Sequence, residues 1–65
     1  MMEQNKQKKL ILIVDDDVDF LTQNKMLLAN EGFEVVTAEG QVEAEKALKE
    51  INPDLVISDL MMENF

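Results

Sequence analysis

Two apolar runs of this sequence each lead directly into aspartate. Residues 10–14 are followed by Asp15 and Asp16, and residues 55–58, apolar except for the last, are followed by Asp59. An uninterrupted apolar run is typical of a strand that is buried on both faces, as in parallel sheets covered by helices. Functional groups collect at the carboxyl ends of such strands. If the two strands are parallel neighbours, three carboxylates meet at one edge, where they repel each other unless a cation joins them.

Oxygen ligands of this kind suit a hard divalent cation such as Mg²⁺. With that charge present, Asp59 could stay ionised and act as a carboxylate nucleophile toward a phosphoryl group. The absence of histidine and cysteine excludes imidazole and thiolate sites, and neither glycine stands in a phosphate-binding loop. A calcium loop that starts at Asp15 is also excluded, because Phe20 and Met26 replace its required glycine and glutamate.

The acidic residues also have simpler interpretations. Asp17 can cap a helix, with Asp19 in its first turn, and Asp54 after a proline is typical of a turn. The spacing of Asp15 and Asp17 also resembles the D-x-D opening of the haloacid dehalogenase phosphatases, although Asp19 stands where that family usually has Thr or Val. On the pattern alone, a shared acidic site and separate strand-end residues fit the sequence equally well.

Length and charge limit the functions open to this segment. A chain of 65 residues buries only ~60% of its unfolded surface, so a single core is marginal. The formal net charge of −8 argues against direct binding of nucleic acid or anionic lipid. No apolar stretch approaches the ~20 residues of a membrane span, and the run after Lys9 is too short for a signal peptide. We therefore expect a cytoplasmic segment without a membrane anchor.

The chain is predicted to form strand, helix, strand, helix and strand after a flexible N-terminal tail at residues 1–8. The strands are expected at residues 9–14, 33–38 and 54–58. The first helix is expected to start at the Asp17 cap and end at Gly32, and the second to follow Gly40 and end before Pro53. Two crossovers of this length give an α/β fold with one parallel sheet.

Each predicted helix carries an apolar stripe that should face the sheet. The stripe of the first helix comprises Phe20, Leu27 and Leu28, and that of the second comprises Ala44, Ala47, Leu48 and Ile51. Asn24 interrupts the first stripe with a polar side chain whose role the pattern does not explain. Phe33, just beyond Gly32, is expected to close against Leu28.

The sequence resembles the receiver domains of bacterial two-component response regulators. The similarity rests on residues 10–17 (LILIVDDD), residues 37–39 (TAE) and residues 53–62 (PDLVISDLMM), and it covers nearly everything from Leu10 onward. It implies a flavodoxin-like, doubly wound parallel sheet, of which this chain supplies the N-terminal half with strand order 2-1-3. It also implies a phosphorelay role rather than enzymatic activity.

The resemblance gives each candidate residue a role. Asp59 corresponds to the phosphoacceptor, which takes a phosphoryl group from a histidine kinase. Asp15 and Asp16 correspond to the acidic pair that holds Mg²⁺ together with Asp59. Met61, two residues beyond the acceptor, would lend its backbone carbonyl to the metal.

Two features depart from the family pattern. Glu63 stands where the family commonly has proline. The chain ends at Phe65, whereas the family domain continues with further strands and helices, including a Ser or Thr and a Lys that contact the phosphoryl group. We therefore expect residues 9–65 to be a truncated receiver domain that is not competent alone.

The same resemblance makes the third strand the edge of the sheet in this chain. An apolar edge strand is prone to pair with another chain. The competing hypothesis is therefore a non-signalling remnant or structural module that associates through the third strand, for example as a homodimer.

Overall fold

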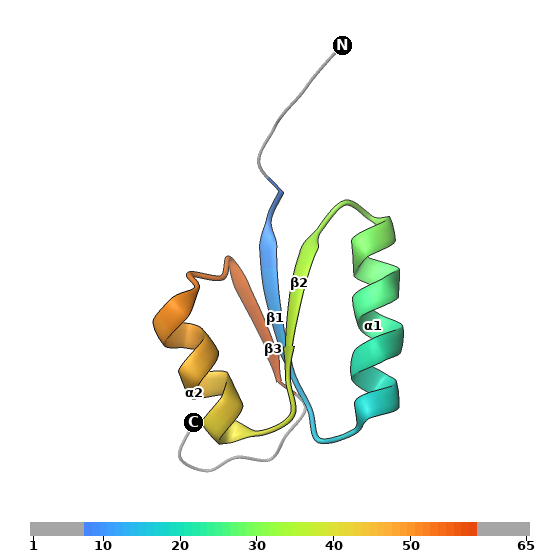
Figure 1. The fold of residues 1–65 in the computed structure, drawn as a ribbon. Helices are drawn as coiled ribbons and strands as arrows, with labels where there is room; N and C mark the ends of the chain where they lie inside the picture. Colours follow the sequence, from blue (N-terminus) through green and yellow to red (C-terminus); the bar gives the residue numbers. More distant parts are fainter. Residues whose placement is uncertain (1–7, 59–65) are drawn as a thin grey trace.

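The structure, a computed structural model, describes residues 8–58 and shows the expected order of elements (Figure 1). They are β1 (Leu10–Val14), α1 (Val18–Asn30), β2 (Glu34–Ala38), α2 (Gln41–Glu50) and β3 (Leu55–Ser58). Each strand begins one residue later than the sequence predicted. The predicted tail lies almost wholly outside the described residues, so its flexibility stays a prediction. None of the helices in the described part of the chain is long and apolar enough to cross a bilayer.

The strands form one parallel sheet in the order β2-β1-β3, which confirms the predicted topology. At the middle of the sheet, Leu12 pairs with Val36 on one side and with Val56 on the other. β1 is therefore central, although it is the first strand in the sequence. β2 and β3 are its two neighbours.

The two helices cover opposite faces of the sheet, and β1 lies between them (Figure 1). Because side chains alternate along a strand, β1 contributes to a separate core on each face. On the α1 face, buried side chains come from β1, β2 and α1: Ile11, Ile13, Leu21 and Val35. On the α2 face they come from β1, β2 and α2: Leu12, Val14, Ala38 and Ala44. The unbroken apolar run of β1 thus reflects burial on both faces.

α1 begins at the predicted cap. Oδ1 of Asp17 accepts hydrogen bonds from the backbone N–H groups of Asp19 (3.0 Å) and Phe20 (3.3 Å). Asp19 lies in the first turn, where the helix dipole favours a negative charge. In the middle of the helix, Nδ2 of Asn24 donates to the carbonyl of Phe20 at 2.8 Å, which explains the polar interruption of the stripe.

α1 ends in a left-handed glycine, as predicted. Gly32 has a φ of +98°, its N–H donates to the carbonyl of Ala29 (3.0 Å), and the N–H of Phe33 donates to that of Leu28 (3.1 Å). This pair of bonds satisfies two of the carbonyls that a helix end leaves free. Phe33 and Leu28 both pack against the core on the α1 face, in line with the expected closure.

Both predicted helix stripes were partly wrong. In α1, Leu21 is buried, whereas Leu27 is 63% exposed, because Leu27 lies one position round the helix from the sheet-facing Leu28. In α2, Leu48 is exposed and Ile51 caps the helix from outside it. α2 contacts β1 and β2 but not β3, and Ala44 is its one fully buried side chain.

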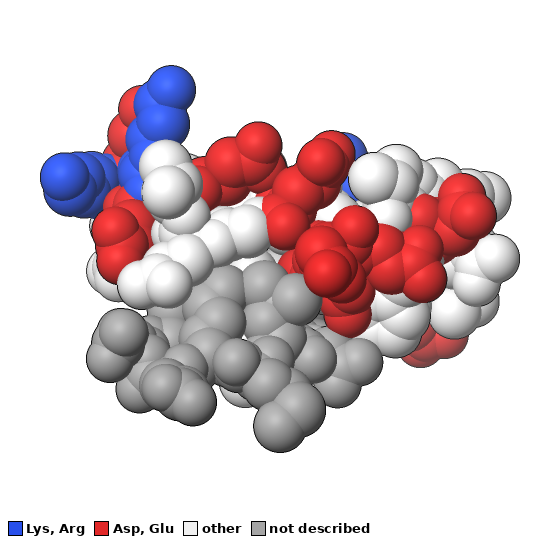
Figure 2. Space-filling view, turned by 90° about the horizontal axis from the view of Figure 1, so that it is seen from below, with Lys and Arg blue, Asp and Glu red and all other residues white. Residues whose placement is uncertain are grey.

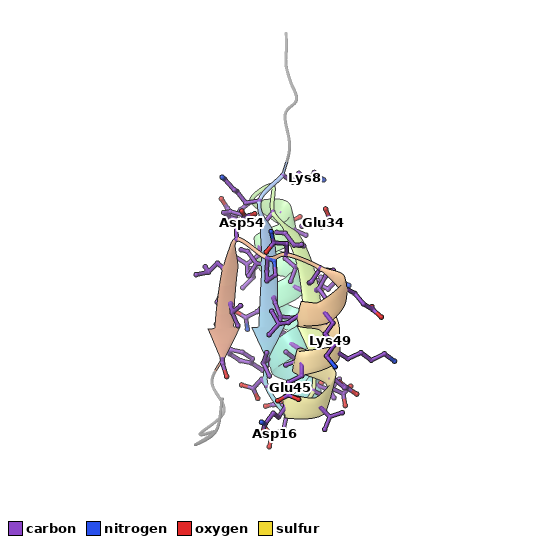
Figure 3. The ribbon with its side chains drawn as sticks, turned by 90° about the vertical axis from the view of Figure 1, so that its left-hand side faces the viewer. Lys8, Asp16, Glu34, Glu45, Lys49 and Asp54 are labelled. Atoms are coloured by element: carbon purple, nitrogen blue, oxygen red, sulfur yellow. The ribbon has the colours of Figure 1, made fainter. Side chains whose placement is uncertain are left out.

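The prediction that the second apolar run is buried on both faces was also wrong. Every residue of β3 is exposed. The exposed fractions are 53% for Leu55, 38% for Val56 and 37% for Ile57, and Ser58 is exposed as well. β3 contacts β1 and no other helix or strand of the described chain, and Figure 3 shows it standing beside α2 rather than beneath it. It is an edge strand, as the resemblance implied.

Candidate functional site

The carboxyl ends of β1 and β3 lie side by side. Val14, the last residue of β1, pairs with Ser58, the last residue of β3. On its other side Val14 pairs with Ala38, which ends β2. Since the strands are parallel, the residues that follow all three strands leave the sheet at one edge. The helix N-termini lie at this same edge (Figure 1).

Asp15 is held at this edge by three attachments. Its chain is continuous with β1, its N–H donates to the carbonyl of Ala38 (3.1 Å), and its Oδ1 accepts from the N–H of Asp17 (2.9 Å). The residue is only 6% exposed, which makes it the one buried charged residue among residues 8–58. Burial of a carboxylate is costly unless hydrogen bonds or an opposite charge compensate it. Among residues 8–58, the one hydrogen bond to the Asp15 carboxylate is that to Oδ1.

Asp16 follows directly and is exposed. Figure 3 shows its side chain projecting at the lower end of the sheet, beyond the end of β1. The structure thus brings the two predicted ligands Asp15 and Asp16 to one edge, one buried and one exposed. This pairing lets the inner carboxylate be oriented by the protein while the outer one stays in contact with solvent.

Asp59 and Met61 lie outside the described residues, so their predicted roles stay predictions. Residues 8–58 contain no group of three acidic, histidine or cysteine side chains placed to hold a metal. Asp15 and Asp16 supply two carboxylates at most. The donors present are oxygen atoms only, which fits a hard cation such as Mg²⁺, but a complete site needs further ligands.

The edge carries a concentration of negative charge (Figure 2). Besides the two candidate ligands, its acidic side chains come from the helix starts and from the residue after β2: Asp17, Asp19, Glu39 and Glu43. Glu43 is engaged locally, since its Oε1 accepts from the N–H of Glu39 at 2.7 Å. A bound cation would relieve part of the repulsion among these groups. Glu39 follows β2 as Asp15 follows β1, so its place at the edge could have been predicted by the same reasoning.

Asp54 lies at the opposite end of the sheet from Asp16 (Figure 3). It exchanges two hydrogen bonds with Leu10: its Oδ2 accepts from the N–H of Leu10 at 2.8 Å, and its own N–H donates to the carbonyl of Leu10 at 2.8 Å. The sequence predicted a turn residue, and the structure adds that this side chain ties the start of β3 to the start of β1. Asp54 is therefore not part of the acidic edge.

Comparison with known proteins finds one family and several curated relatives. Residues 11–65 match the model of the response regulator receiver domain. The transcriptional regulatory protein GlrR of Escherichia coli K12 is 45% identical over 53 residues. The DNA-binding response regulator MtrA of Mycobacterium tuberculosis H37Rv is 36% identical over 55 residues. The CAI-1 autoinducer sensor kinase/phosphatase CqsS of Vibrio cholerae is 35% identical over 63 residues.

These alignments cover most of this chain and little of the relatives. They include 82%, 85% and 97% of the chain but only 12%, 24% and 9% of GlrR, MtrA and CqsS. No solved structure gives a significant match. The parallel β2-β1-β3 sheet, the acidic pair at its carboxyl edge and the match over residues 11–65 lead to the same assignment. The chain belongs to the response regulator receiver domain family.

Proposed function

We propose that this chain is the phosphoacceptor part of a two-component phosphorelay, in which Asp59 takes a phosphoryl group from a histidine kinase. Asp15, Asp16 and the carbonyl of Met61 would hold Mg²⁺ beside it. The observation that supports this most directly is the register of the two strand ends. Val14 pairs with Ser58, Asp15 follows Val14, and Asp59 is bonded to Ser58. A cytoplasmic location belongs to the same proposal.

The chemistry follows from the carboxylates. Bound Mg²⁺ would supply the positive charge that allows three carboxylates and a phosphoryl group to come together. A carboxylate oxygen of Asp59 attacks phosphorus, and the bond between phosphorus and the donor's imidazole nitrogen breaks, which leaves an acyl phosphate. The hydrogen bonds at the N–H and Oδ1 of Asp15 support this proposed role, because they orient its carboxylate. The chain accepts the group rather than turning over a separate substrate, so it is not proposed to be an enzyme.

Within these residues the acyl phosphate should be poorly stabilised. The chain has six basic residues, all lysines, and none of them follows the carboxyl end of a strand: Lys6, Lys8, Lys9, Lys25, Lys46 and Lys49. The acidic edge therefore has no neighbouring ammonium group from the described elements to pair with a phosphoryl oxygen. We expect low occupancy of the modified form in the 65-residue chain.

The exposed β3 favours a second candidate function. The chain could serve as a structural module that associates through its sheet edge without accepting a phosphoryl group. Leu55, Val56 and Ile57 are the apolar side chains that such a role would use. The two functions differ in what they require, because only phosphotransfer depends on Asp59 and on Mg²⁺.

Phosphorylation with acetyl phosphate and Mg²⁺ tests the proposal by intact mass. We expect a small Mg²⁺-dependent fraction that carries one phosphoryl group. Asp59→Asn should abolish it, while Asp54→Asn should leave it unchanged, since Asp54 lies at the far end of the sheet. Modification that persists in Asp59→Asn, or that is absent at every Mg²⁺ concentration, contradicts the proposal.

A Mg²⁺ titration followed by NMR tests the metal site separately. The amides of Asp15 and Asp16 should shift at millimolar Mg²⁺, because the ion would bind beside both residues. Asp59→Asn should weaken binding further, and Asp54→Asn serves as the control for loss of one carboxylate elsewhere. If Asp15 and Asp16 do not shift, no Mg²⁺ site forms in this chain.

A further inference from the structure

Three aspartates at alternate positions join the end of β1 to the start of α1. Oδ1 of Asp15 accepts a hydrogen bond from the N–H of Asp17 at 2.9 Å. Oδ1 of Asp17 in turn accepts from the N–H groups of Asp19 at 3.0 Å and of Phe20 at 3.3 Å. The candidate metal ligand Asp15 is therefore connected to the first turn of α1 through Asp17.

Asp17 is hydrogen bonded in both directions along the chain. Its N–H donates to Asp15, and its carbonyl accepts from the N–H of Leu21 at 3.1 Å. Leu21 is buried in the core on the α1 face, so this second bond ties Asp17 to the packed side of the helix. The backbone of Asp17 is extended, with φ of −95° and ψ of 106°. In this conformation its side chain caps α1 while its N–H is bonded to the preceding carboxylate.

The carboxylate of Asp15 depends on this one bond for its orientation. Among residues 8–58, the N–H of Asp17 is its hydrogen-bond donor, and the residue is buried. The last torsion of an aspartate side chain is only weakly restrained by its own covalent geometry. A bond that fixes Oδ1 therefore also decides where the other carboxylate oxygen lies.

We propose that Asp17 is a positioning residue for the Mg²⁺ site. By capping α1 with its side chain, it keeps its own N–H on Oδ1 of Asp15 and so orients that carboxylate toward the metal. The inference rests on the proposed function, in which Asp15 is a Mg²⁺ ligand. Hydrogen-bond partners commonly orient metal ligands in this way, and loss of such a partner lowers metal affinity by about 10–100-fold.

Asp17 is not itself placed as a ligand. Its Oδ1 is directed at the first turn of α1, where it accepts two N–H groups. Among residues 8–58, no three acidic side chains are placed to hold a metal ion, so the aspartates at positions 15–17 do not form a site by themselves. Asp17 therefore contributes the orientation of Asp15 rather than an oxygen of its own.

Substitutions at position 17 separate the cap from the charge and from the stability of the helix. Asp17→Asn removes the charge but keeps an oxygen that can cap α1, whereas Asp17→Ala removes both. Asp17→Gly also removes the capping oxygen, but glycine is tolerated at this position of a helix almost as well as the usual capping residues. Gly32→Ser is the control, because it strains α1 at its other end and leaves the acidic edge unchanged.

A Mg²⁺ titration followed at the amides of Asp15 and Asp16 gives the dissociation constant for each variant. Asp17→Ala and Asp17→Gly should each raise it about tenfold above the value for Asp17→Asn, because only these two lose the orienting bond. Asp17→Asn should raise it about two- to threefold above the value for the unchanged chain, through the loss of one negative charge near the ion. Gly32→Ser should leave it unchanged.

A second measurement needs no metal. The temperature coefficient of the amide proton of residue 17 reports whether that N–H is hydrogen bonded. Without Mg²⁺, the coefficient should stay that of a bonded amide in Asp17→Asn and Gly32→Ser. It should move toward that of a solvated amide in Asp17→Ala and Asp17→Gly. Equal far-UV circular dichroism of the four variants would show that all of them are folded.

The outcomes distinguish this proposal from the proposed function. Equal weakening of Mg²⁺ binding by Asp17→Asn and Asp17→Ala would overturn the positioning role, because the charge alone would then explain it. A bonded amide in Asp17→Gly would overturn it as well, as would a lost bond that leaves Mg²⁺ affinity at the Asp17→Asn value. Failure of the proposed function has another signature: the unchanged chain would bind no Mg²⁺, while the temperature coefficients would still confirm or overturn the effect of Asp17 on Asp15.

Discussion

β1 and β3 are strands of almost the same composition with opposite environments. β1 reads LILIV and β3 reads LVIS, and four residues of each pair with one another in register. Yet residues 11–14 of β1 are at most 3% exposed, while every residue of β3 is exposed. The paired residues of the two strands lie at the same level of the sheet and are of similar types. Neither their composition nor their level therefore explains the difference in exposure.

The difference comes from neighbours. β1 has a strand on each side and a helix over each face, whereas β3 has one strand and no helix among the described elements. An apolar run therefore indicates that a segment can be buried, and the surrounding elements decide whether it is. The two strands should therefore also differ in how much each contributes to the free energy of unfolding, which can be measured.

The largest expected effect comes from truncating the same residue type in each strand. Ile13 and Ile57 pair across the two strands on the same face, but Ile13 is 1% exposed and Ile57 is 37% exposed. Ile13→Ala should lower the free energy of unfolding by about 2–5 kcal/mol, because it leaves a cavity in the core. Ile57→Ala should lower it by about 1 kcal/mol or less.

Urea denaturation followed by circular dichroism measures both values, at concentrations low enough to keep the chain monomeric. A domain of 65 residues has roughly 3–10 kcal/mol of stability in total, so Ile13→Ala should be largely unfolded at the lower limit. Equal losses for the two variants would mean that β3 is covered in solution.

The next effect concerns α1, the helix that covers β1 on one face. Gly32 and Gly40 both have open space where a Cβ would lie, but φ is +98° at Gly32 and −167° at Gly40. Gly32→Ser should lower the free energy of unfolding by about 1–2 kcal/mol, because a side chain disfavours the left-handed conformation. Gly40→Ser should be neutral or raise it by up to about 1 kcal/mol, since a serine could cap α2.

Thermal melts of the two serine variants would show opposite shifts in Tm. This pair isolates backbone conformation, because neither substitution meets a steric neighbour. A loss at Gly40→Ser as large as that at Gly32→Ser would show that the glycines are needed for a reason other than φ.

The smallest effect concerns the tie between the strands. Asp54→Ala removes the acceptor for the N–H of Leu10 and should cost about 0.5–1.5 kcal/mol. Asp54→Asn keeps a side-chain oxygen and should cost less. Hydrogen exchange measured at the Leu10 amide should become faster in Asp54→Ala while the amides on the β2 side of β1 change little. Uniform acceleration along β1 would instead indicate a global loss of stability.

The sequence predicted the order of helices and strands along the chain because the signals for each are local. The Asp17 cap and the Gly32 terminus each depend on a few neighbouring residues, and both were confirmed. The strand order came from the family resemblance and was confirmed as well. Of the candidate site, Asp15 and Asp16 were placed at the predicted edge, while Asp59 and Met61 lie outside the described residues.

The errors concern burial, which depends on elements distant in sequence. Leu27 and Leu48 fit helical periodicity, but each lies on a part of its helix that does not pack against the sheet. Leu55–Ser58 were predicted to be buried because, like β1, they form an almost uninterrupted apolar run. The specific bonds made by Asp54 and Asn24 were also beyond prediction, because each depends on exact side-chain geometry.

The central place of β1 has a consequence for synthesis of the chain. Of the described strands and helices, β1 is synthesised first, yet its edge toward β3 is paired only by residues near position 55. Leu10 and its hydrogen-bond partner Asp54 are 44 residues apart, which corresponds to roughly 2–9 s of translation. During that interval β1, which is entirely apolar, has no strand paired on that side. The pairing of β1 with β3 therefore forms only well after β1 itself has been made.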